Sequence, residues 1–448
     1  MILYGENSFF VAAGTVTGSC FCYVSSADEF IMVDFGMFQG LPELQELNGK
    51  IPQIPFSKLT GVLLTHAHLD HCGRLPILYR QGYSGKIYMT KATREILELT
   101  LLDTLKLARH GEGPVLFSEQ DVSSVLRSAS IVDYHVPFQL GSVTVEFFDA
   151  GHILGSASIV LTDATKKIVF SGDIGNFPED IVRPTEFIKE ADSIIMESTY
   201  GDRLHPVEDV DALLGEQVKA IEQSGGTLLI PSFSIERTQD LLHRFDHLKT
   251  SRKIAAQTKI YLDSPMGSSV TDIYEKHPEL YNDELSEHAR HDNPFNFQGF
   301  HEVRDSKESQ SIHHEIGPKV IIAGSGMMNG GRILSHAKFY LPSPSTRLLF
   351  VGFQAEGTMG RRIIEGAEYV LIDGTEVLVR AEVAVIHALS AHADQKQLLD
   401  WFGHISSPQK VFLVHGENPA REVLGDLIKH IAPKVKVHMP DYEEEISL

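Results

Sequence analysis

The sequence is poor in several residue types, and each shortage narrows the kind of protein it can encode. It has only three cysteines, Cys20, Cys22 and Cys72, without the spacing of a zinc finger. It has no apolar run of about 18 residues or more, which argues against a membrane-spanning helix. The first residues, MILYGENSFFVAAG, lack the basic start and continuous apolar stretch of a signal peptide. Together these shortages predict a protein of the reducing cytoplasm.

Basic residues are also scarce relative to acidic ones. Lys and Arg number 39 against 60 Asp and Glu, which gives a formal net charge of -21. Such a surface repels the phosphate backbone of nucleic acids, which Lys and Arg ordinarily hold. The charge alone favours a hydrolase of small molecules. A nucleic-acid site would therefore need a local basic pocket, helped by bound metal cations.

Short runs of β-branched residues alternate with loops and helical segments, which predicts an α/β fold. At 448 residues the chain is long enough for two domains. Strands are expected at residues 30–33, 62–65, 143–148, 168–170, 193–196, 227–230, 259–262, 319–323, 347–351, 383–387 and 411–414.

Side chains that can bind metals follow many of these strands, at the sheet edge where α/β proteins build their sites. These side chains fall in two blocks, residues 30–200 and 385–420, and the region between them is poor in histidine and acid clusters. We therefore expect one metal-binding domain, made of residues 1–205 and 385–448, with a separate α/β domain inserted at 206–384. The strand at 383–387 is expected to mark the return to the first domain.

The densest motif is HAHLDH at residues 66–71, directly after an apolar strand. Imidazole nitrogen and carboxylate oxygen are common ligands of zinc. A loop of this composition can serve two metals, with His66 and His68 on one and Asp70 and His71 on the other. Asp173, which follows a later strand, could bridge two cations through its two oxygens. The pattern predicts two Zn²⁺ ions, and Mn²⁺ is an alternative.

Several segments resemble a known family. HAHLDH, preceded by Asp34 and followed by GHILGSAS and SGDIG, resembles the metallo-β-lactamase superfamily. MESTYG with Glu197, LSAHAD with His392 and VHGE with His415 resemble the further motifs of its β-CASP branch, which comprises nucleic-acid-processing nucleases. The nearest likeness is to the bacterial and archaeal relatives of the endonuclease subunit of the eukaryotic cleavage and polyadenylation specificity factor. This resemblance implies a metallo-β-lactamase αββα sandwich with an inserted Rossmann-like β-CASP domain.

The resemblance also implies a role for individual residues. One metal would be held by His66, His68, His152 and Asp173, and the second by Asp70, His71, Asp173 and His415. Asp34 matches a buried aspartate that supports the ligand loop, while Glu197 and His392 would form a hydrogen-bonded pair beside the metals. In the implied reaction, metal-activated hydroxide oriented by Asp70 attacks phosphorus, and His392 is the general acid.

Contacts to the substrate are predicted from a few further residues. Ser325 and Arg332 lie in the glycine-rich segment GSGMMNGGR, and Arg361 and Ser390 are additional candidates. The glycine-rich segment fits a phosphate cradle and a tight turn equally well. For the arginines, a surface salt bridge is the alternative use.

The expected substrate is single-stranded RNA, and both endonucleolytic and 5′-exonucleolytic cleavage fit the sequence. Two alternatives are a DNA nuclease of the same branch and a small-molecule metallohydrolase such as a lactonase or thioesterase. A non-catalytic scaffold is disfavoured because the candidate ligands are all present. No membrane partner is expected, and a homodimer is compatible with the sequence.

Overall fold

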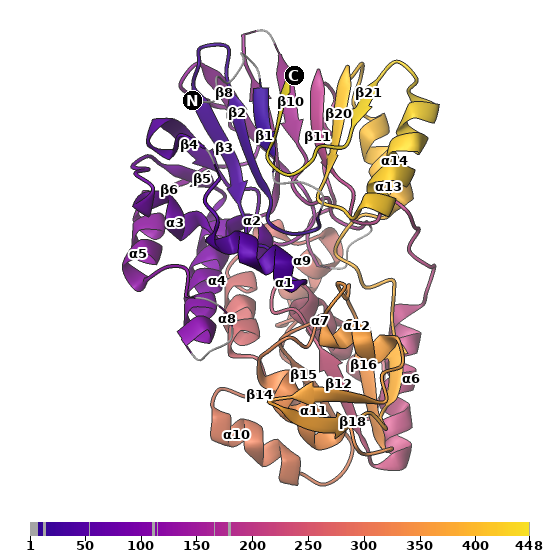
Figure 1. Ribbon diagram of the computed structural model, residues 1–448. Coiled ribbons are helices and arrows are strands. Elements are labelled where there is room, and N and C mark those ends of the chain that lie inside the picture. Colours follow the sequence, from indigo (N-terminus) through magenta and orange to yellow (C-terminus); the bar gives the residue numbers. More distant parts are fainter. Residues whose placement is uncertain are drawn as a thin grey trace. The chain divides into compact units, whose positions relative to one another are not determined.

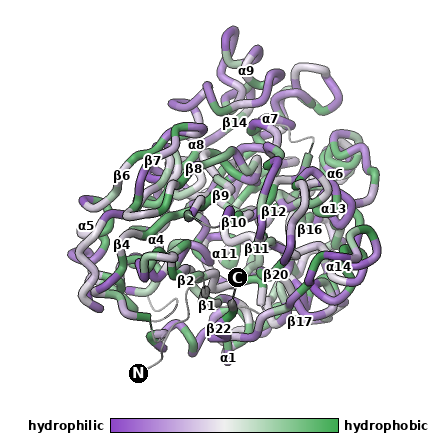
Figure 2. Tube along the Cα trace, turned by 90° about the horizontal axis from the view of Figure 1, so that it is seen from above, coloured by the Kyte–Doolittle hydropathy of each residue, from purple (hydrophilic) through white to green (hydrophobic). Residues whose placement is uncertain are grey.

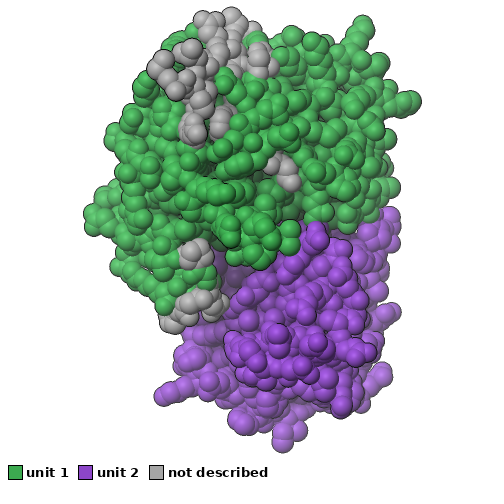
Figure 3. Space-filling model, in the orientation of Figure 1, with its two compact units in different colours: residues 1–204, 392–448 green, residues 205–391 purple. Residues whose placement is uncertain are grey.

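The inserted segment of the chain folds separately from the segments on either side of it. The computed structural model describes residues 8–11, 15–52, 54–109, 113, 115–164, 166–177 and 181–447. Unit 1 comprises residues 1–204 and 392–448, and unit 2 comprises residues 205–391 (Figure 3). The expectation of no signal peptide rests largely on residues 1–7 and 12–14, which lie outside the described residues.

Unit 1 contains two mixed sheets. The first has the order β22-β1-β2-β3-β4-β5-β6, with β1 (Ser8–Val11), β2 (Cys20–Val24), β3 (Phe30–Phe35), β4 (Leu59–Leu63), β5 (Ile87–Met89), β6 (Ala129–Ile131) and β22 (Glu444–Ser447). The second has the order β21-β20-β11-β10-β9-β8-β7, with β7 (Phe138–Leu140), β8 (Val143–Asp149), β9 (Ala157–Thr162), β10 (Lys167–Phe170), β11 (Ser193–Glu197), β20 (Lys410–Val414) and β21 (Lys436–His438).

The two sheets of unit 1 pack face to face, and helices cover their outer faces (Figure 1). Phe21 and Val33 of the first sheet share a core with Phe147 and Ile195 of the second. Outside the first sheet lie α2 (Leu69–Cys72), α3 (Leu75–Arg80), α4 (Lys91–Arg109) and α5 (Glu119–Ser128). Outside the second lie α13 (Gln395–Gly403) and α14 (Asn418–Ile431). These four layers confirm the expected αββα sandwich.

Helices α13 and α14 of unit 1 each bury one face. In α13 and α14, Leu398, Trp401, Leu424 and Ile428 pack against the outer side of the second sheet. The colour along α14 accordingly changes between green and purple in Figure 2, as in an amphipathic helix at a protein surface. Both helices follow residues of the candidate site, so their packing fixes where those residues lie.

Unit 2 is built on a parallel sheet of order β14-β13-β15-β12-β16-β19. Its strands are β12 (Thr227–Pro231), β13 (Lys259–Leu262), β14 (Phe300–Glu302), β15 (Lys319–Ala323), β16 (Thr346–Phe350) and β19 (Glu382–Val385), and a separate ribbon pairs β17 (Tyr369–Ile372) with β18 (Thr375–Leu378). Its helices are α6 (Val210–Ser224), α7 (Arg237–Thr250), α8 (Pro265–Tyr274), α9 (Asp283–Ala289), α10 (Ser306–Ser311), α11 (Arg332–Tyr340) and α12 (Met359–Ile364). An all-parallel sheet with helical crossovers is the Rossmann-like pattern.

The strands expected from the sequence are all present, with ends that shift by a few residues at most. The second domain boundary differs from the expectation. The segment expected to return to the first domain contains β19, which pairs in parallel with β16 at the edge of the unit 2 sheet. Unit 1 therefore resumes at His392 rather than at residue 385. Among the described residues, no helix has both the length and the apolar character needed to cross a bilayer.

Candidate metal centre

The candidate ligands meet at the carboxyl ends of central strands in unit 1. In the second sheet β10, β11 and β20 are parallel neighbours, so the residues at their ends, Asp173, Glu197 and His415, lie side by side. The loop after β8 supplies His152, and the HAHLDH segment follows β4 of the first sheet. Residues far apart in the sequence are therefore gathered by strand order.

The first ligand cluster comprises His66, His68, His152 and Asp173, with one donor atom of each within 4.8 Å of the others. His68 Nδ1 lies 3.1 Å from His66 Nε2 and 3.1 Å from His152 Nε2. Asp173 Oδ2 lies 3.4 Å from His66 Nε2 and 3.6 Å from His152 Nε2. Neighbouring donors in a tetrahedral zinc site are roughly 3.3 Å apart. The cluster therefore has the dimensions of a zinc site.

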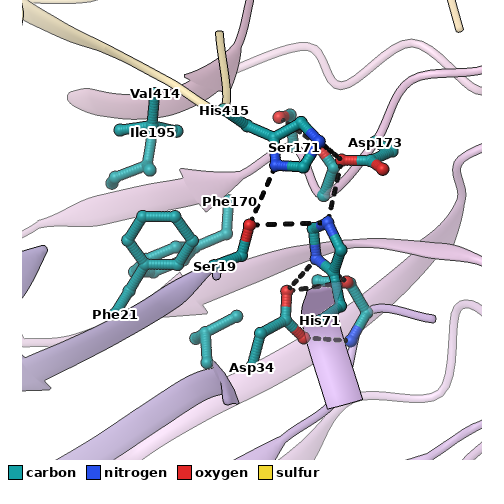
Figure 4. A pocket seen from close by; sticks show the side chains of 13 residues that line it. Ser19, Phe21, Asp34, His71, Phe170, Ser171, Asp173, Ile195, Val414 and His415 are labelled. Atoms are coloured by element: carbon teal, nitrogen blue, oxygen red, sulfur yellow. Dashed lines mark hydrogen bonds and ion pairs between the residues drawn. The ribbon is translucent and has the colours of Figure 1, made fainter. Parts of the chain in front are cut away.

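The second ligand cluster comprises Asp70, His71 and His415, whose donor atoms also lie within 4.8 Å of one another. Asp173 Oδ1 reaches this cluster, 3.2 Å from His71 Nε2 and 3.6 Å from His415 Nε2 (Figure 4). Asp70 Oδ2 lies 3.9 Å from His415 Nε2. Asp173 thus directs one carboxylate oxygen toward each cluster, which is the geometry of a bridging ligand.

The donor atoms fit a pair of divalent cations. Asp173 is buried, and its two oxygens face imidazole nitrogens of both clusters at 3.2 to 3.6 Å. A buried carboxylate is costly unless charge or hydrogen bonds compensate it, so a cation between the clusters would stabilise it. The mixture of imidazoles and carboxylates is the donor set that zinc prefers and that manganese also accepts.

Burial and neighbouring carboxylates shift the pKa values of the ligand histidines in opposite directions. Burial lowers the pKa of His68 to about 4, which favours the neutral imidazole that binds metals. Burial also acts to lower the pKa of His71, but Asp173 and Asp34 on its two sides raise it well above its usual value. A metal ion must therefore displace a proton from His71 when it binds.

A layer of hydrogen bonds behind the ligands fixes their rings (Figure 4). Asp34 Oδ2 accepts from His71 Nδ1 at 2.8 Å and from Thr65 Oγ1 at 2.8 Å, while its Oδ1 accepts from the Thr65 amide at 2.8 Å. On the other side, Ser19 Oγ lies 3.0 Å from His415 Nδ1. Asp34 thus contacts both Thr65 and His71, and its role in supporting the ligands stays a prediction. Ser19 was not predicted, because a single serine before a strand carries no spacing signal.

Two site residues adopt a left-handed backbone conformation. Asp34 has φ 58° and His415 has φ 46°, a region that residues with a Cβ seldom occupy outside functional or tightly constrained sites. Close packing also leaves no room beside the ligand loop, since a Cβ on Gly36 would come 1.5 Å from the carbonyl oxygen of Asp70. The backbone around the clusters is therefore held in one conformation by its neighbours.

Glu197 and His392 form a contact pair next to the clusters. Glu197 is fully buried, and its Oε1 lies 3.2 Å from His392 Nδ1 and accepts from the amide of Ile174 at 2.7 Å. One ring nitrogen of His392 lies within 4.8 Å of donor atoms of Asp173 and His415. Burial by itself lowers the pKa of His392, but Glu197 and more distant carboxylates raise it to about 9. The Glu197 carboxylate therefore favours the protonated form of the His392 ring.

The residues predicted to contact substrate belong to unit 2, and most are engaged in local contacts there. Arg332 donates to Asp263 Oδ1 at 2.5 Å and to the carbonyl of Val303 at 3.2 Å. Arg361 donates to Glu365 at 2.6 Å. Ser325 Oγ accepts from the amide of Asn329 at 3.0 Å, within a loop where a Cβ on Gly331 would come 2.5 Å from the carbonyl of Gly324. These contacts favour a tight turn for the glycine-rich segment and salt bridges for the two arginines. Both were the alternatives to a contact with substrate. Ser390 is buried.

The hydrogen bonds of Asp34 give a first testable expectation. Asp34→Asn should lower metal affinity about 10- to 100-fold, the usual effect of losing a carboxylate behind a metal-binding histidine. Competition with a chromophoric chelator measures this affinity. Asp121→Asn is the matched control, because Asp121 contacts Arg80 and Ser118 outside the site. Equal affinity in the Asp34 variant and the wild type would show that Asp34 does not support the ligands.

Comparison with known proteins places the whole arrangement in a family. Residues 34–232 match the family described as "Beta-lactamase superfamily domain", residues 238–363 match "Beta-Casp domain", and residues 376–440 match "Zn-dependent metallo-hydrolase RNA specificity domain". A solved structure of a protein of unknown function from Enterococcus faecalis V583 covers 99% of this chain and 100% of its own, with a TM-score of 0.55 and 15% identity, and so shares the fold.

Curated relatives agree with these matches. The chain is 37% identical over 425 residues to "Ribonuclease TTHA0252" of Thermus thermophilus, covering 94% of this chain and 95% of the relative. It is 31% identical over 435 residues to "Transcription termination factor FttA" of Methanosarcina mazei, covering 94% and 67%. It is 32% identical over 375 residues to "RNase J-like protein" of Methanocaldococcus jannaschii, covering 82% and 84%. The chain therefore belongs to the β-CASP branch of the metallo-β-lactamase superfamily, and it is an RNA-hydrolysing nuclease of that branch.

Proposed function

We propose that this ribonuclease uses two zinc ions, one in each ligand cluster, to hydrolyse phosphodiester bonds of single-stranded RNA. The position of Asp173 carries the proposal, because its two carboxylate oxygens face different clusters. The first ion would be held by His66, His68, His152 and Asp173, and the second by Asp70, His71, Asp173 and His415. When bound, such ions lower the pKa of water and stabilise charge on phosphoryl oxygens.

The chain's own residues would orient the reactants and move protons. Asp70 stands at the start of α2 with its side chain partly exposed, where a carboxylate can orient the attacking water and accept its proton. His392, fixed through Nδ1 by Glu197, would use its other ring nitrogen to protonate the leaving ribose oxygen. The Glu197 carboxylate receives two backbone amides as well, from Ile174 and Thr199, so its own position is rigid.

The acidic composition is compatible with RNA as the substrate if the phosphate is attracted mainly at the metal centre. With a formal net charge of -21, the chain has little general affinity for polyanions. Two divalent cations would supply the local positive charge. Because few phosphates would then be neutralised by Lys and Arg, cleavage should depend only weakly on salt. The names of the relatives include both ribonucleases and a transcription termination factor, so we extend the proposal to cleavage of cellular transcripts.

An assay on the purified chain tests this proposal. End-labelled single-stranded RNA, DNA of matched sequence and a generic lactone are offered at low and moderate salt, with metal content measured in parallel. We expect about two zinc ions in the catalytic clusters of each chain, as in two-metal sites, loss of RNA cleavage on chelation, and recovery with Zn²⁺. Fragment lengths separate internal cleavage from removal of nucleotides at the 5′ end. Cleavage that survives complete chelation, or recovery with Mn²⁺ alone, would contradict the role given to zinc.

We also propose a cellular compartment and an oligomeric state for the protein. Cys20, Cys22 and Cys72 are buried and unpaired, which supports a reducing compartment such as the cytoplasm. Association into a homodimer remains a hypothesis, which light scattering on the purified protein will test.

A further inference from the structure

Three histidines meet inside unit 2, in the part of the sequence that was expected to be poor in histidine clusters. His243 and His247 lie on α7, four residues apart, so they occupy the same face of that helix. His288 comes from α9. One ring nitrogen of each of the three lies within 4.8 Å of the others. No ligand of the catalytic clusters takes part in this group, so it requires a separate explanation.

The rings are arranged compactly around a common point. Ring centroids are 4.1 Å apart for His243 and His247, 5.6 Å for His243 and His288, and 5.7 Å for His247 and His288. The planes of His247 and His288 are 15° apart, and that of His243 is inclined to both. In a zinc site the donors stand roughly 3.3 Å apart. Small side-chain rotations from the observed spacing would bring three nitrogens to that distance.

The innermost ring carries an unsatisfied polar atom. His243 is 2% exposed, and its Nδ1 has no hydrogen-bond partner within the residues that the structure describes. A buried polar atom without a partner is costly unless something else binds it. Burial and the neighbouring His247 and His288 rings lower the pKa of His243 to about 3. The ring is therefore neutral at physiological pH, which is the form that coordinates metals.

Carboxylates stand beside the three rings. Asp246 Oδ2 forms an ion pair with His288 Nε2 at 3.4 Å; it lies outside the set of three mutually close donors, so it would have to turn toward His243 and His247 to become a fourth ligand. Burial raises the pKa of Asp246, and His288 and His247 oppose that shift. Asp292 adds negative charge near Asp246, whereas Asp211, which is near His247, is already paired with Arg244. A cation is the ligand that this combination of imidazoles and carboxylates attracts.

We propose that His243, His247 and His288 form a structural Zn²⁺ site in unit 2, separate from the two catalytic clusters of unit 1. Asp246 would complete this site. Histidines at positions i and i+4 of one helix chelate a single ion, and the third histidine ties α9 to α7. A closed set of four protein ligands leaves no open position for substrate, so this site stabilises the inserted domain and does not take part in RNA cleavage.

Zinc content tests the proposal directly. Wild-type protein and the double variant His247→Asn/His288→Asn are dialysed against one buffered, low free zinc concentration, and bound zinc is measured by mass spectrometry. We expect the double variant to lose one zinc ion per chain, to melt at a lower temperature, and to keep its rate of RNA cleavage. His291→Asn is the matched control, since its side chain is 75% exposed and pairs with Glu287. Equal zinc content in the double variant and the wild type would overturn the site.

Chemical modification of the wild-type protein tests the same site without a substitution that could prevent folding. Diethyl pyrocarbonate modifies accessible neutral imidazoles, and mass spectrometry locates the products. After chelation, His247 and His288 should react, and addition of Zn²⁺ should protect them, whereas His291 should react under both conditions. Reaction of His247 and His288 at the same rate with and without Zn²⁺ would count against the site independently of any substitution.

Discussion

Asp173→Asn should abolish most RNA cleavage and lower the metal content of both ligand clusters. The substitution keeps the size of the side chain but removes the charge that both clusters share through Oδ1 and Oδ2. Electrostatic stabilisation by bound cations is worth several kcal/mol, and about 1.4 kcal/mol is tenfold in rate, so we expect a loss of about a thousandfold or more in kcat/KM. Cleavage of labelled RNA and zinc analysis of the same preparation measure the two effects.

A substitution at another buried aspartate, Asp163, distinguishes loss of metal binding from a general loss of stability. Asp163 is buried in unit 1 and accepts hydrogen bonds from Tyr23 and Ser26. Asp163→Asn should lower the melting temperature while leaving zinc content and cleavage near wild-type levels. If Asp173→Asn kept the zinc content and the turnover of the wild type, the bridging role would be wrong.

His392→Ala should slow turnover strongly without removing metal. General acid catalysis typically contributes about 10²- to 10⁴-fold, so kcat should fall in that range. Glu197→Gln should also slow turnover, because the neutral amide no longer favours a protonated ring at His392. The effect of the double variant should be much smaller than the product of the two single effects, since both act on one proton.

The leaving group distinguishes proton donation from metal binding. A nitrophenyl phosphodiester needs no proton on its leaving oxygen, so His392→Ala should cleave it almost as fast as the wild type does. His404→Ala is the matched control, because His404 stacks on Phe187 away from the ligands and is half exposed. A loss of zinc in His392→Ala would instead make His392 a ligand, which its approach to Asp173 and His415 also permits.

The sequence predicted those features that depend on local pattern or on strand order. HAHLDH is contiguous, so its metal-binding character is visible without the fold. Asp173 and His415 were found because each follows a short apolar strand, and parallel strands bring their carboxyl ends to one edge. The family resemblance added the pairing of Glu197 with His392, which the structure places 3.2 Å apart.

Other features depend on contacts that local pattern does not contain. Ser19 approaches His415 only because the first sheet packs on the second. His288 joins His243 and His247 through helix packing in unit 2, so a search for clusters along the chain passes over it. The domain boundary was misplaced because β19 has the composition of any buried strand, and only its pairing with β16 shows which sheet it completes.

The order in which the chain is synthesised has a consequence for its activity. β20 pairs with β11 across an insertion, and Ser198 donates to the carbonyl of Val414, 216 positions further along the chain. A ribosome therefore produces the HAHLDH segment early but reaches His415 only after all of unit 2 has emerged. A polypeptide released before that point contains the first ligand cluster and lacks part of the second. If the second cluster is required for cleavage, neither a nascent chain nor a prematurely terminated product should cleave RNA before His415 has been added.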